Sequence, residues 1–258
     1  MMTLSHVKLK LIHIRSFLLK SYIKAHSSNE TINYDNLMIV APHPDDESFA
    51  CGGLISSSRI NGRQVSVAFV TDGGASHQAC NCNMPPRILG SIRRRLAVQA
   101  DSILGVDESS LIWLDLRDGG IPDRHDKDFK MACNLLADSF QKINPCAVFA
   151  PHFMDVWPDH VATSHIVQNA ISIYGKPVIL YYYPVWLFFK TKFRYFSKIG
   201  QLRIINLNIA DVIQNKDEAI KCYTREVNPV CGKPYVGKLP PGFVDLFKDS
   251  SEFYFTSP

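Results

Sequence analysis

Apolar and polar positions follow two different periods along most of the chain. Short, almost continuously apolar runs are typical of strands buried on both faces of a sheet, and they occur at residues 37–41, 65–70, 111–114, 146–150, 178–183 and 203–207. The stretches between them predict helices, at residues 48–61, 91–104, 129–143, 159–174 and 210–224. Strands that alternate with helices predict an α/β fold with a mostly parallel sheet and helices on both faces.

The N-terminal part has a different pattern. Residues 4–24 predict an amphipathic helix, because apolar residues recur at three- and four-residue steps on one face. That face consists of Leu4, Val7, Leu11, Ile14 and Leu18. The polar stretch 26–31 predicts a linker. We therefore expect a helix and linker over residues 1–35 and one domain over residues 36–258.

Charge is unevenly distributed between these two parts. The chain of 258 residues has a formal net charge of +4, from 28 Lys and Arg against 24 Asp and Glu. Residues 1–26 contain five basic residues and no acidic one, so the rest of the chain carries +4 − 5 = −1. A nearly neutral body disfavours nucleic acid as a partner, because nucleic-acid binding needs a basic folded surface.

The sequence favours a cytoplasmic protein. No apolar stretch reaches the roughly 18 residues that a membrane span needs, and the first 26 residues lack the apolar core of a signal peptide. The seven Cys have irregular spacing, which fits a reducing compartment. Without a pair of CxxC motifs we expect no structural zinc knuckle. The thiols of Cys80 and Cys82 can chelate a metal, form a strained disulfide or simply be two loop thiols.

Titratable residues follow the first predicted strand. Ligands of parallel sheets bind at the carboxyl ends of strands, and here the strand is followed by the sequence PHPDDE over residues 42–47. His43 and Asp46 are three residues apart across a tight turn and can act as zinc ligands. Asp45 beside them can take a proton from water activated by the metal. The alternative is that Asp45 and Asp46 only cap the next helix.

A second cluster follows the predicted strand 146–150. His160 can supply the third zinc ligand, which leaves a fourth position for water, as in catalytic sites. Asp159 can orient a ligating ring. His165 lies further into the helix and is more typical of an ordinary surface or core histidine. Two His and Asp clusters at the ends of two buried strands favour a catalytic metal site.

These motifs resemble the PIG-L/LmbE-type zinc de-N-acetylases over roughly residues 36–258. The segment 39–48 followed by Cys-Gly-Gly carries the most specific likeness, and further matches occur at 70–73, 93, 104–106, 118–120, 158–160, 239–243 and 252. The resemblance implies a Rossmann-like fold, Zn²⁺ held by His43, Asp46 and His160, and Asp45 as general base and then general acid. It also implies hydrolysis of the N-acetyl group of an N-acetylglucosamine-type sugar linked to a nucleotide, a lipid or a polysaccharide.

The sequence departs from the family pattern at two positions. The family's second motif usually begins with a His that helps stabilise the oxyanion, and Trp157 occupies that position. Indole can donate one hydrogen bond but cannot bind metal. We expect another His to substitute, first of all His152, because it leaves the same strand end. In the helical Arg-x-x-Glu motif Leu96 replaces the Glu, although Arg93 remains.

Four residues are expected to contact the substrate: Asp72, Arg93, Asp118 and Trp157. For Asp72 the alternative is that it caps a turn. Residues 186–203 combine basic and aromatic side chains. They can stack on sugar rings or, with residues 1–26, form a peripheral membrane contact; the alternative is a packed surface hairpin.

Other functions stay open at this stage. A related amide hydrolase would remove another acyl group or cleave a thiol conjugate. Trp157 also allows a protein that binds metal and sugar with little turnover. A nucleotide-binding module is disfavoured because no GxGxxG follows the first strand: Cys51-Gly52-Gly53 lies inside a predicted helix.

Overall fold

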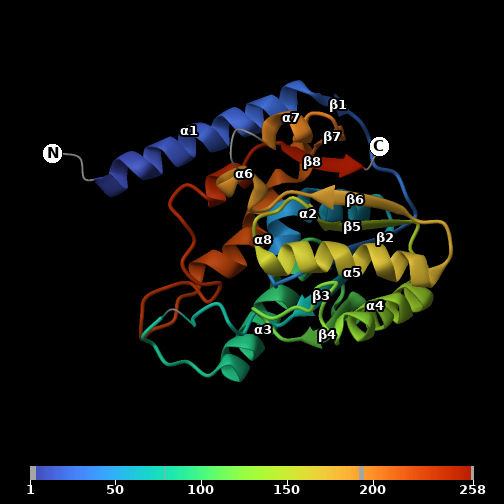
Figure 1. Cartoon of the computed structure of the whole chain (residues 1–258), viewed down its shortest axis with the longest axis horizontal. Coiled ribbons are helices and arrows are strands. Elements are labelled where there is room, and N and C mark those ends of the chain that lie inside the picture. Colours follow the sequence, from blue (N-terminus) through green and yellow to red (C-terminus); the bar gives the residue numbers. More distant parts are fainter. Residues whose placement is uncertain (1–3, 79, 192–194, 257–258) are drawn as a thin grey trace.

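The computed structural model describes residues 4–78, 80–191 and 195–256. Within these residues one eight-stranded sheet has the order β1-β7-β8-β6-β5-β2-β3-β4 (Figure 1). Its strands are β1 (Ser27–Asn29), β2 (Asn36–Ala41), β3 (Gln64–Thr71), β4 (Leu111–Leu116), β5 (Ala147–Pro151), β6 (Ile179–Tyr183), β7 (Arg203–Asn208) and β8 (Ser251–Thr256). Only β8 runs antiparallel to its neighbours, so the predicted mostly parallel sheet is confirmed.

Helices cover both faces of this sheet. The longer ones are α1 (Leu4–Ala25), α2 (Asp46–Ile60), α3 (Pro86–Ile103), α4 (Phe129–Ile143), α5 (Pro158–Tyr174) and α8 (Ile213–Arg225). Two single-turn helices, α6 (Leu187–Lys190) and α7 (Phe196–Ile199), lie between β6 and β7. α4 packs against α5, whereas α8 packs against α2 and α3 (Figure 1). Right-handed crossovers place these two groups on opposite faces.

The site lies where the direction of strand order reverses. β2 has β3 and β5 as its neighbours in the sheet. From β2 the chain continues through α2 to β3, toward one edge of the sheet. From β5 it continues through α5 to β6, toward the other edge. The carboxyl ends of β2 and β5 therefore border one crevice, the usual position of ligands in open parallel sheets. Both strands are wholly or almost wholly buried, which holds this edge in place.

Two strands were not predicted. The expected linker 26–31 contains β1, which pairs with β7. It is a polar edge strand held by hydrogen bonds, so it carries no hydrophobic signal. β8 lies between β6 and β7 and reverses direction, and its antiparallel pairing depends on residues far away in the sequence.

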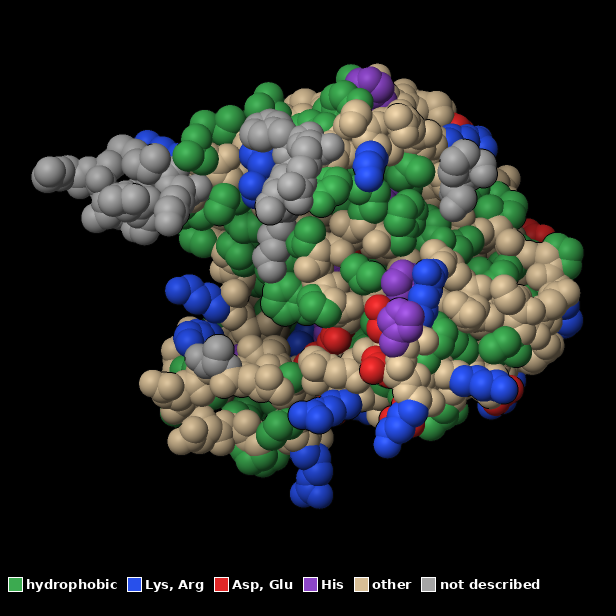
Figure 2. All heavy atoms as spheres, viewed as in Figure 1, with side chains coloured by type: hydrophobic (Ala, Val, Ile, Leu, Met, Phe, Trp, Pro, Cys, Tyr) green, Lys and Arg blue, Asp and Glu red, His purple; other side chains and the backbone are tan. Residues whose placement is uncertain are grey.

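Helix α1 packs on the body with a different face from the apolar one identified in the sequence. Leu19 and Ile23 are fully buried, whereas Leu11, Ile14 and Leu18 are 45–60% exposed. Figure 2 shows hydrophobic side chains along this part of the surface. The side chains of Leu4 and Val7, also assigned to the predicted face, lie outside the described part of the structure. The apolar face of Leu11, Ile14 and Leu18 is therefore largely exposed, and it is not the face that packs on the body.

Polar anchors explain this orientation of α1. The Arg15 guanidinium donates a hydrogen bond to the Phe189 carbonyl at 2.7 Å, and Lys20 pairs with Asp249 at 2.8 Å. These contacts turn the Leu19 side of the helix toward the body. The helical period alone could not select this face, because apolar residues also occupy the opposite side.

The burial of Leu19 leads to a stability prediction. We expect Leu19→Ala to lower the free energy of unfolding by about 2–5 kcal/mol, because it removes buried methyl groups and leaves a cavity. Leu18→Ala, next to it but 45% exposed, should change stability by less than about 0.5 kcal/mol. Urea unfolding of both variants measures the difference. Equal losses would contradict the packing of α1.

The segment 186–203 is partly packed into the core. Phe188 and Phe189 are buried, and residues 192–194 of this segment lie outside the described residues. Contact of this segment and of residues 1–26 with a membrane stays a prediction. Among the helices of the described residues, none is long and apolar enough to cross a bilayer.

Candidate active site

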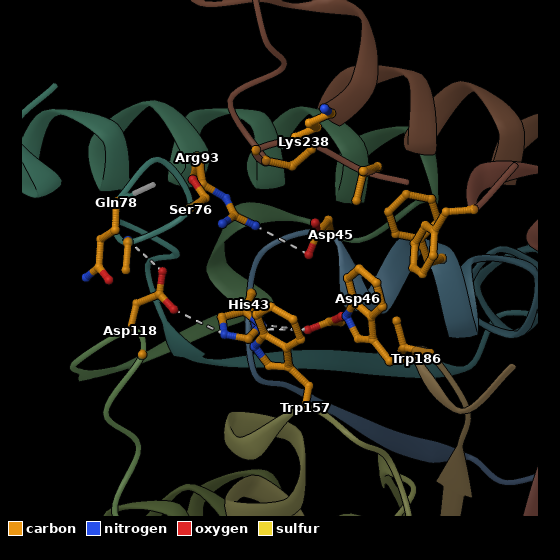
Figure 3. A pocket seen from close by; sticks show the side chains of 18 residues that line it. His43, Asp45, Asp46, Ser76, Gln78, Arg93, Asp118, Trp157, Trp186 and Lys238 are labelled. Atoms are coloured by element: carbon orange, nitrogen blue, oxygen red, sulfur yellow. Dashed lines mark hydrogen bonds and ion pairs between the residues drawn. The ribbon is translucent and has the colours of Figure 1, made fainter. Parts of the chain in front are cut away.

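The loop after β2 brings His43, Asp45 and Asp46 to the floor of a pocket. The loop is fixed at its start, because Thr71 at the end of β3 donates a hydrogen bond from its hydroxyl to the Pro42 carbonyl at 2.9 Å. It is fixed again by Arg93 of α3, whose guanidinium donates to the Pro44 carbonyl. Figure 2 shows a hollow on this face of the molecule, and Figure 3 shows the side chains that line it.

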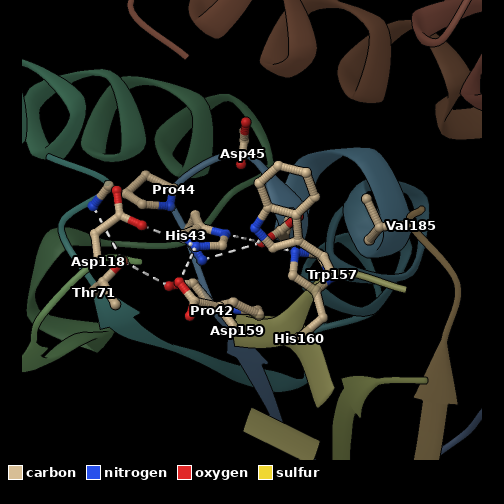
Figure 4. A network of polar contacts seen from close by, with 12 residues as sticks. Pro42, His43, Pro44, Asp45, Thr71, Asp118, Trp157, Asp159, His160 and Val185 are labelled. Carbon is tan, nitrogen blue, oxygen red and sulfur yellow. Dashed lines mark hydrogen bonds and ion pairs between the residues drawn. The ribbon is translucent and has the colours of Figure 1, made fainter. Parts of the chain in front are cut away.

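His43, Asp46 and His160 form a compact group of metal-binding atoms. One ligand atom from each residue lies within 4.8 Å of the other two. Asp46 Oδ2 lies 3.2 Å from His43 Nδ1 and 3.3 Å from His160 Nε2. Figure 4 shows the two histidines. Two imidazoles and a carboxylate are suitable ligands for zinc.

The far sides of both rings face carboxylates. His43 Nε2 lies 3.2 Å from both Asp118 Oδ1 and Asp159 Oδ2. His160 Nδ1 lies 3.5 Å from Asp155 Oδ2. Carboxylates behind ligating histidines fix the tautomer and make the ring a better ligand. The ring nitrogens that face Asp46 are thereby left for a cation.

His160 supplies a direct test of this fit. Its ring is fully buried, and neither nitrogen makes a hydrogen bond of good geometry although carboxylates lie within 3.5 Å. Buried polar atoms nearly always have partners. A metal ion at Nε2 would satisfy this nitrogen, so the residues present fit a metal.

Electrostatics in the site favour a cation. Burial opposes the charge of His43, but hydrogen bonds to Asp118, Asp159 and Asp46 outweigh it and raise the pKa of the ring well above its ordinary value. Burial likewise opposes the charge of His160, but Asp46 and Asp155 raise its pKa to about 9. Positive charge is thus stabilised where the donor atoms converge.

These raised pKa values predict how metal affinity depends on pH. Without a metal, the His160 ring binds a proton at neutral pH, and a metal must displace it. We expect affinity to rise with pH by about tenfold per unit for each proton displaced, until the pH reaches the His160 pKa of about 9. Competition titrations with a zinc chelator at several pH values measure this. An affinity independent of pH would contradict it.

Asp45 lies beside this group in a strained conformation. Its φ is 135°, a value that non-glycine residues rarely adopt and that is typical of functional sites. It occupies the N-cap position of α2 but makes no side-chain capping bond. Its Oδ1 lies 3.3 Å from the Arg93 guanidinium and lines the pocket (Figure 3). Helix capping therefore does not account for this side chain.

The pKa of Asp45 is suited to proton transfer. Burial of the carboxyl group raises this pKa to about 8, against the opposing effect of the Arg93 charge. A general base is most effective when its pKa is close to the working pH. Asp46 behaves differently: burial acts to raise its pKa, but His160 and His43 outweigh that effect and hold it below its ordinary value. The pKa values of the two neighbouring carboxyl groups are therefore shifted in opposite directions.

The expected substrate contacts differ in their positions. Arg93, Asp118 and Trp157 line the pocket. Asp118 also contacts His43 and accepts a hydrogen bond from the Ala75 backbone at 2.6 Å. Asp72 is not among the lining residues, and its Oδ1 accepts a hydrogen bond from the Gly74 backbone at 2.9 Å. Its position thus favours the alternative, a turn cap.

His152 does not reach the pocket. Its side chain is fully buried and packs 4.7 Å from the ring of Phe255 and 4.5 Å from that of Phe153, measured between ring centroids. Burial lowers its pKa to about 4, which keeps the ring neutral. The position of His152 therefore does not support its expected role as the replacement for the oxyanion-stabilising His. Leaving the same strand end was not sufficient, because the side chain turns into the core.

Trp157 forms an aromatic wall of the pocket. Its ring stacks on Trp186 with centroids 5.1 Å apart and planes 20° apart. Trp186 in turn lies 4.5 Å from Phe243. Trp186 lies on the opposite side of the pocket from Asp118 (Figure 3).

Two further acidic residues of the site, Asp155 and Glu47, had no role among the sequence predictions. Asp155 is buried, and besides facing His160 it accepts a hydrogen bond from the Trp186 backbone at 2.9 Å. Glu47 is also buried and accepts hydrogen bonds from the Asp45 backbone at 2.9 Å and from the Tyr223 hydroxyl at 2.8 Å. Both lie within the two motifs already identified, so the motifs could have drawn attention to them.

Comparison with known proteins agrees with this geometry in fold and family. A conserved protein of Thermus thermophilus aligns with 25% identity and a TM-score of 0.60 over 86% of this chain and 94% of its own. The N,N'-diacetylchitobiose deacetylase of Pyrococcus horikoshii aligns with 20% identity and a TM-score of 0.59 over 86% and 79%. A 4-carboxy-2-hydroxymuconate hydratase of Pseudomonas putida also shares the fold, with 25% identity and a TM-score of 0.57 over 73% and 78%.

Sequence comparison is more specific about the reaction. A probable N-acetyl-α-D-glucosaminyl L-malate deacetylase of Bacillus cereus is 28% identical over 193 residues, which is 72% of this chain and 80% of that protein. Residues 38–171, more than half of the chain, match the family model of GlcNAc-PI de-N-acetylase, PIG-L. This range contains both histidine and aspartate motifs. The chain therefore belongs to the PIG-L family of de-N-acetylases.

Proposed function

We propose that this chain uses zinc to hydrolyse the N-acetyl group of an N-acetylglucosamine-type sugar to a free amine and acetate. The observation that supports this most strongly is the group of His43, Asp46 and His160 at the floor of a pocket that also contains Asp45. A zinc ion held by these three residues would polarise the amide carbonyl and activate water. The deacetylases among the relatives support the acetyl group and the sugar.

The residues around this group have separate roles in the proposal. Asp45 takes a proton from the attacking water and later gives it to the departing amine nitrogen, so its carboxyl ends the cycle unchanged. Arg93 positions Asp45 through their 3.3 Å contact. Asp159 and Asp155 hold the rings of His43 and His160 in orientation.

The aromatic wall supports a sugar as substrate. Sugar rings present C–H groups that pack on aromatic faces, and the Trp157 indole, 37% exposed, lines the pocket. Asp118 and Arg93 also line the pocket and supply polar groups. One apolar wall and a few polar groups are typical of sites that orient small ligands.

Trp157 leads to a prediction on substrate binding. We expect Trp157→Ala to raise KM about three- to tenfold, because it removes the ring face on which the sugar packs. Trp157→Phe keeps an aromatic ring and should retain most of the affinity. Steady-state kinetics of both variants measure this. An unchanged KM in Trp157→Ala would show that the sugar does not contact this wall.

Acetate release from defined substrates tests the proposal. The zinc-loaded protein is incubated with N-acetylglucosaminides that carry a nucleotide, a lipid, a malate or a second sugar, and acetate and free amine are measured. N-propionyl and N-butyryl glucosaminides and thiol conjugates test the related amide hydrolases. Because a hydratase shares the fold, an unsaturated carboxylate is tested as a substrate in a further arm of the experiment. Turnover only in that arm, or none in any arm, would overturn the proposal.

A further inference from the structure

A second group of metal-binding side chains lies outside the pocket floor. His77, Cys80 and Cys82 lie in the loop between β3 and α3, and Cys231 lies in the loop after α8. One donor atom from each of the four residues lies within 4.8 Å of the others. All three cysteines are free thiols rather than disulfides.

The spacing of these donor atoms fits a tetrahedral ion. With Zn–S bonds of about 2.3 Å and Zn–N bonds of about 2.0 Å, neighbouring ligand atoms should be about 3.5 Å (N to S) to 3.8 Å (S to S) apart. His77 Nδ1 lies 3.4 Å from Cys82 Sγ and 3.8 Å from Cys231 Sγ. The three side chains are thus close to the arrangement that zinc requires.

The orientation of His77 also favours a ligand role. Its Nε2 lies 2.8 Å from the Pro234 carbonyl, which can only accept a hydrogen bond, so the ring proton is on Nε2. The lone pair of Nδ1 then points toward the thiols. A backbone carbonyl behind a ligating histidine is a common feature of metal sites.

We propose that His77, Cys80, Cys82 and Cys231 bind a structural Zn²⁺ ion that joins the loop before α3 to the loop after α8. Four protein ligands leave no position for substrate or water, which distinguishes this site from the group at His43. The absence of paired CxxC motifs argued against a zinc knuckle but left metal chelation by Cys80 and Cys82 open. The fourth ligand here comes from a segment almost 150 residues away.

The two loops border the pocket, so the ion would act on its walls. Ser76 and Gln78 line the pocket from the first loop, and Val236 and Gly237 line it from the second. The Ser76 hydroxyl donates a hydrogen bond to the Tyr235 carbonyl at 2.8 Å. At Gly237, with φ of +89°, an added Cβ would lie 2.7 Å from the Ser76 carbonyl oxygen. The loops are in direct contact, and the ion would hold them in this register.

Metal content and cobalt absorption test this proposal on the full-length chain. Purified under reducing conditions, the wild type should contain about two zinc ions. Cys82→Ser and Cys231→Ser should each lose about one, whereas Cys222→Ser, a thiol of α8 outside the group, should lose none. With Co²⁺ in place of zinc, the wild type should show thiolate-to-cobalt charge-transfer absorption. The group at His43 contains no cysteine and cannot produce this band.

This design separates the second site from the proposed reaction. In His160→Ala the charge-transfer band should persist, even though the first metal is lost. If the cysteine variants fail to fold, the thiols of the wild type can be counted instead: three should react only after the metal is removed by a chelator. Absence of the cobalt band in the wild type would overturn the proposal. So would a disulfide among these cysteines, seen by mass spectrometry in protein purified under reducing conditions.

Discussion

Asp45→Asn is expected to retain its metal and to lose about 10²–10⁴-fold in kcat. The substitution keeps the size of the side chain but removes the group that accepts a proton. Asp45 is not one of the three residues whose ligand atoms converge on the metal position. Zinc content and acetate release of the purified variant measure the two effects separately. A large loss of kcat with full metal content assigns proton transfer to this carboxyl group.

The control for this variant is Asp107→Asn. The Asp107 side chain is 80% exposed and lies 3.8 Å from Arg59, away from the pocket. Asp107→Asn makes the same chemical change as Asp45→Asn. Because Asp107 lies away from the pocket, the kcat of this variant should stay within about twofold of wild type. Full activity in Asp45→Asn would show that the base assignment is wrong. Loss of zinc in this variant would instead place Asp45 among the metal ligands.

His160→Ala is expected to lose the metal of the pocket and at least about 10³-fold in activity, because the metal supplies several kcal/mol of transition-state stabilisation. The fully buried ring is the only one of the three proposed ligands that α5 contributes. Removing it leaves His43 and Asp46, which come from a single loop. Metal analysis and acetate release report both losses.

His165→Ala is a matched control on the same helix. His165 lies five residues further along α5, where its Nδ1 is 2.6 Å from the Asp123 carboxylate near the surface. We expect wild-type metal content and activity, in agreement with the interpretation of His165 as an ordinary histidine. Equal losses in both variants would indicate damage to α5 rather than loss of a ligand.

The candidate site could be read from the sequence to the extent that its residues are local. His43, Asp45 and Asp46 share one turn after a buried strand, and His160 follows the start of another element. Such turns depend on neighbouring residues and on a strand end, both of which leave a pattern in the sequence. The structure does not place His152 among the residues that line the pocket, because side chains after a strand can turn either way, and here the ring packs against aromatic side chains of the core.

The chain by itself determined the alternation of strands and helices, and with it the edge where the motifs meet. These properties arise from short periods of apolar residues, which act within one element. Only the tertiary structure decided which face of α1 is buried, how β1 and β8 join the sheet, and that Cys231 lies beside His77, Cys80 and Cys82. Each of these depends on contacts between segments far apart along the chain, and no local pattern records which partner a residue will meet.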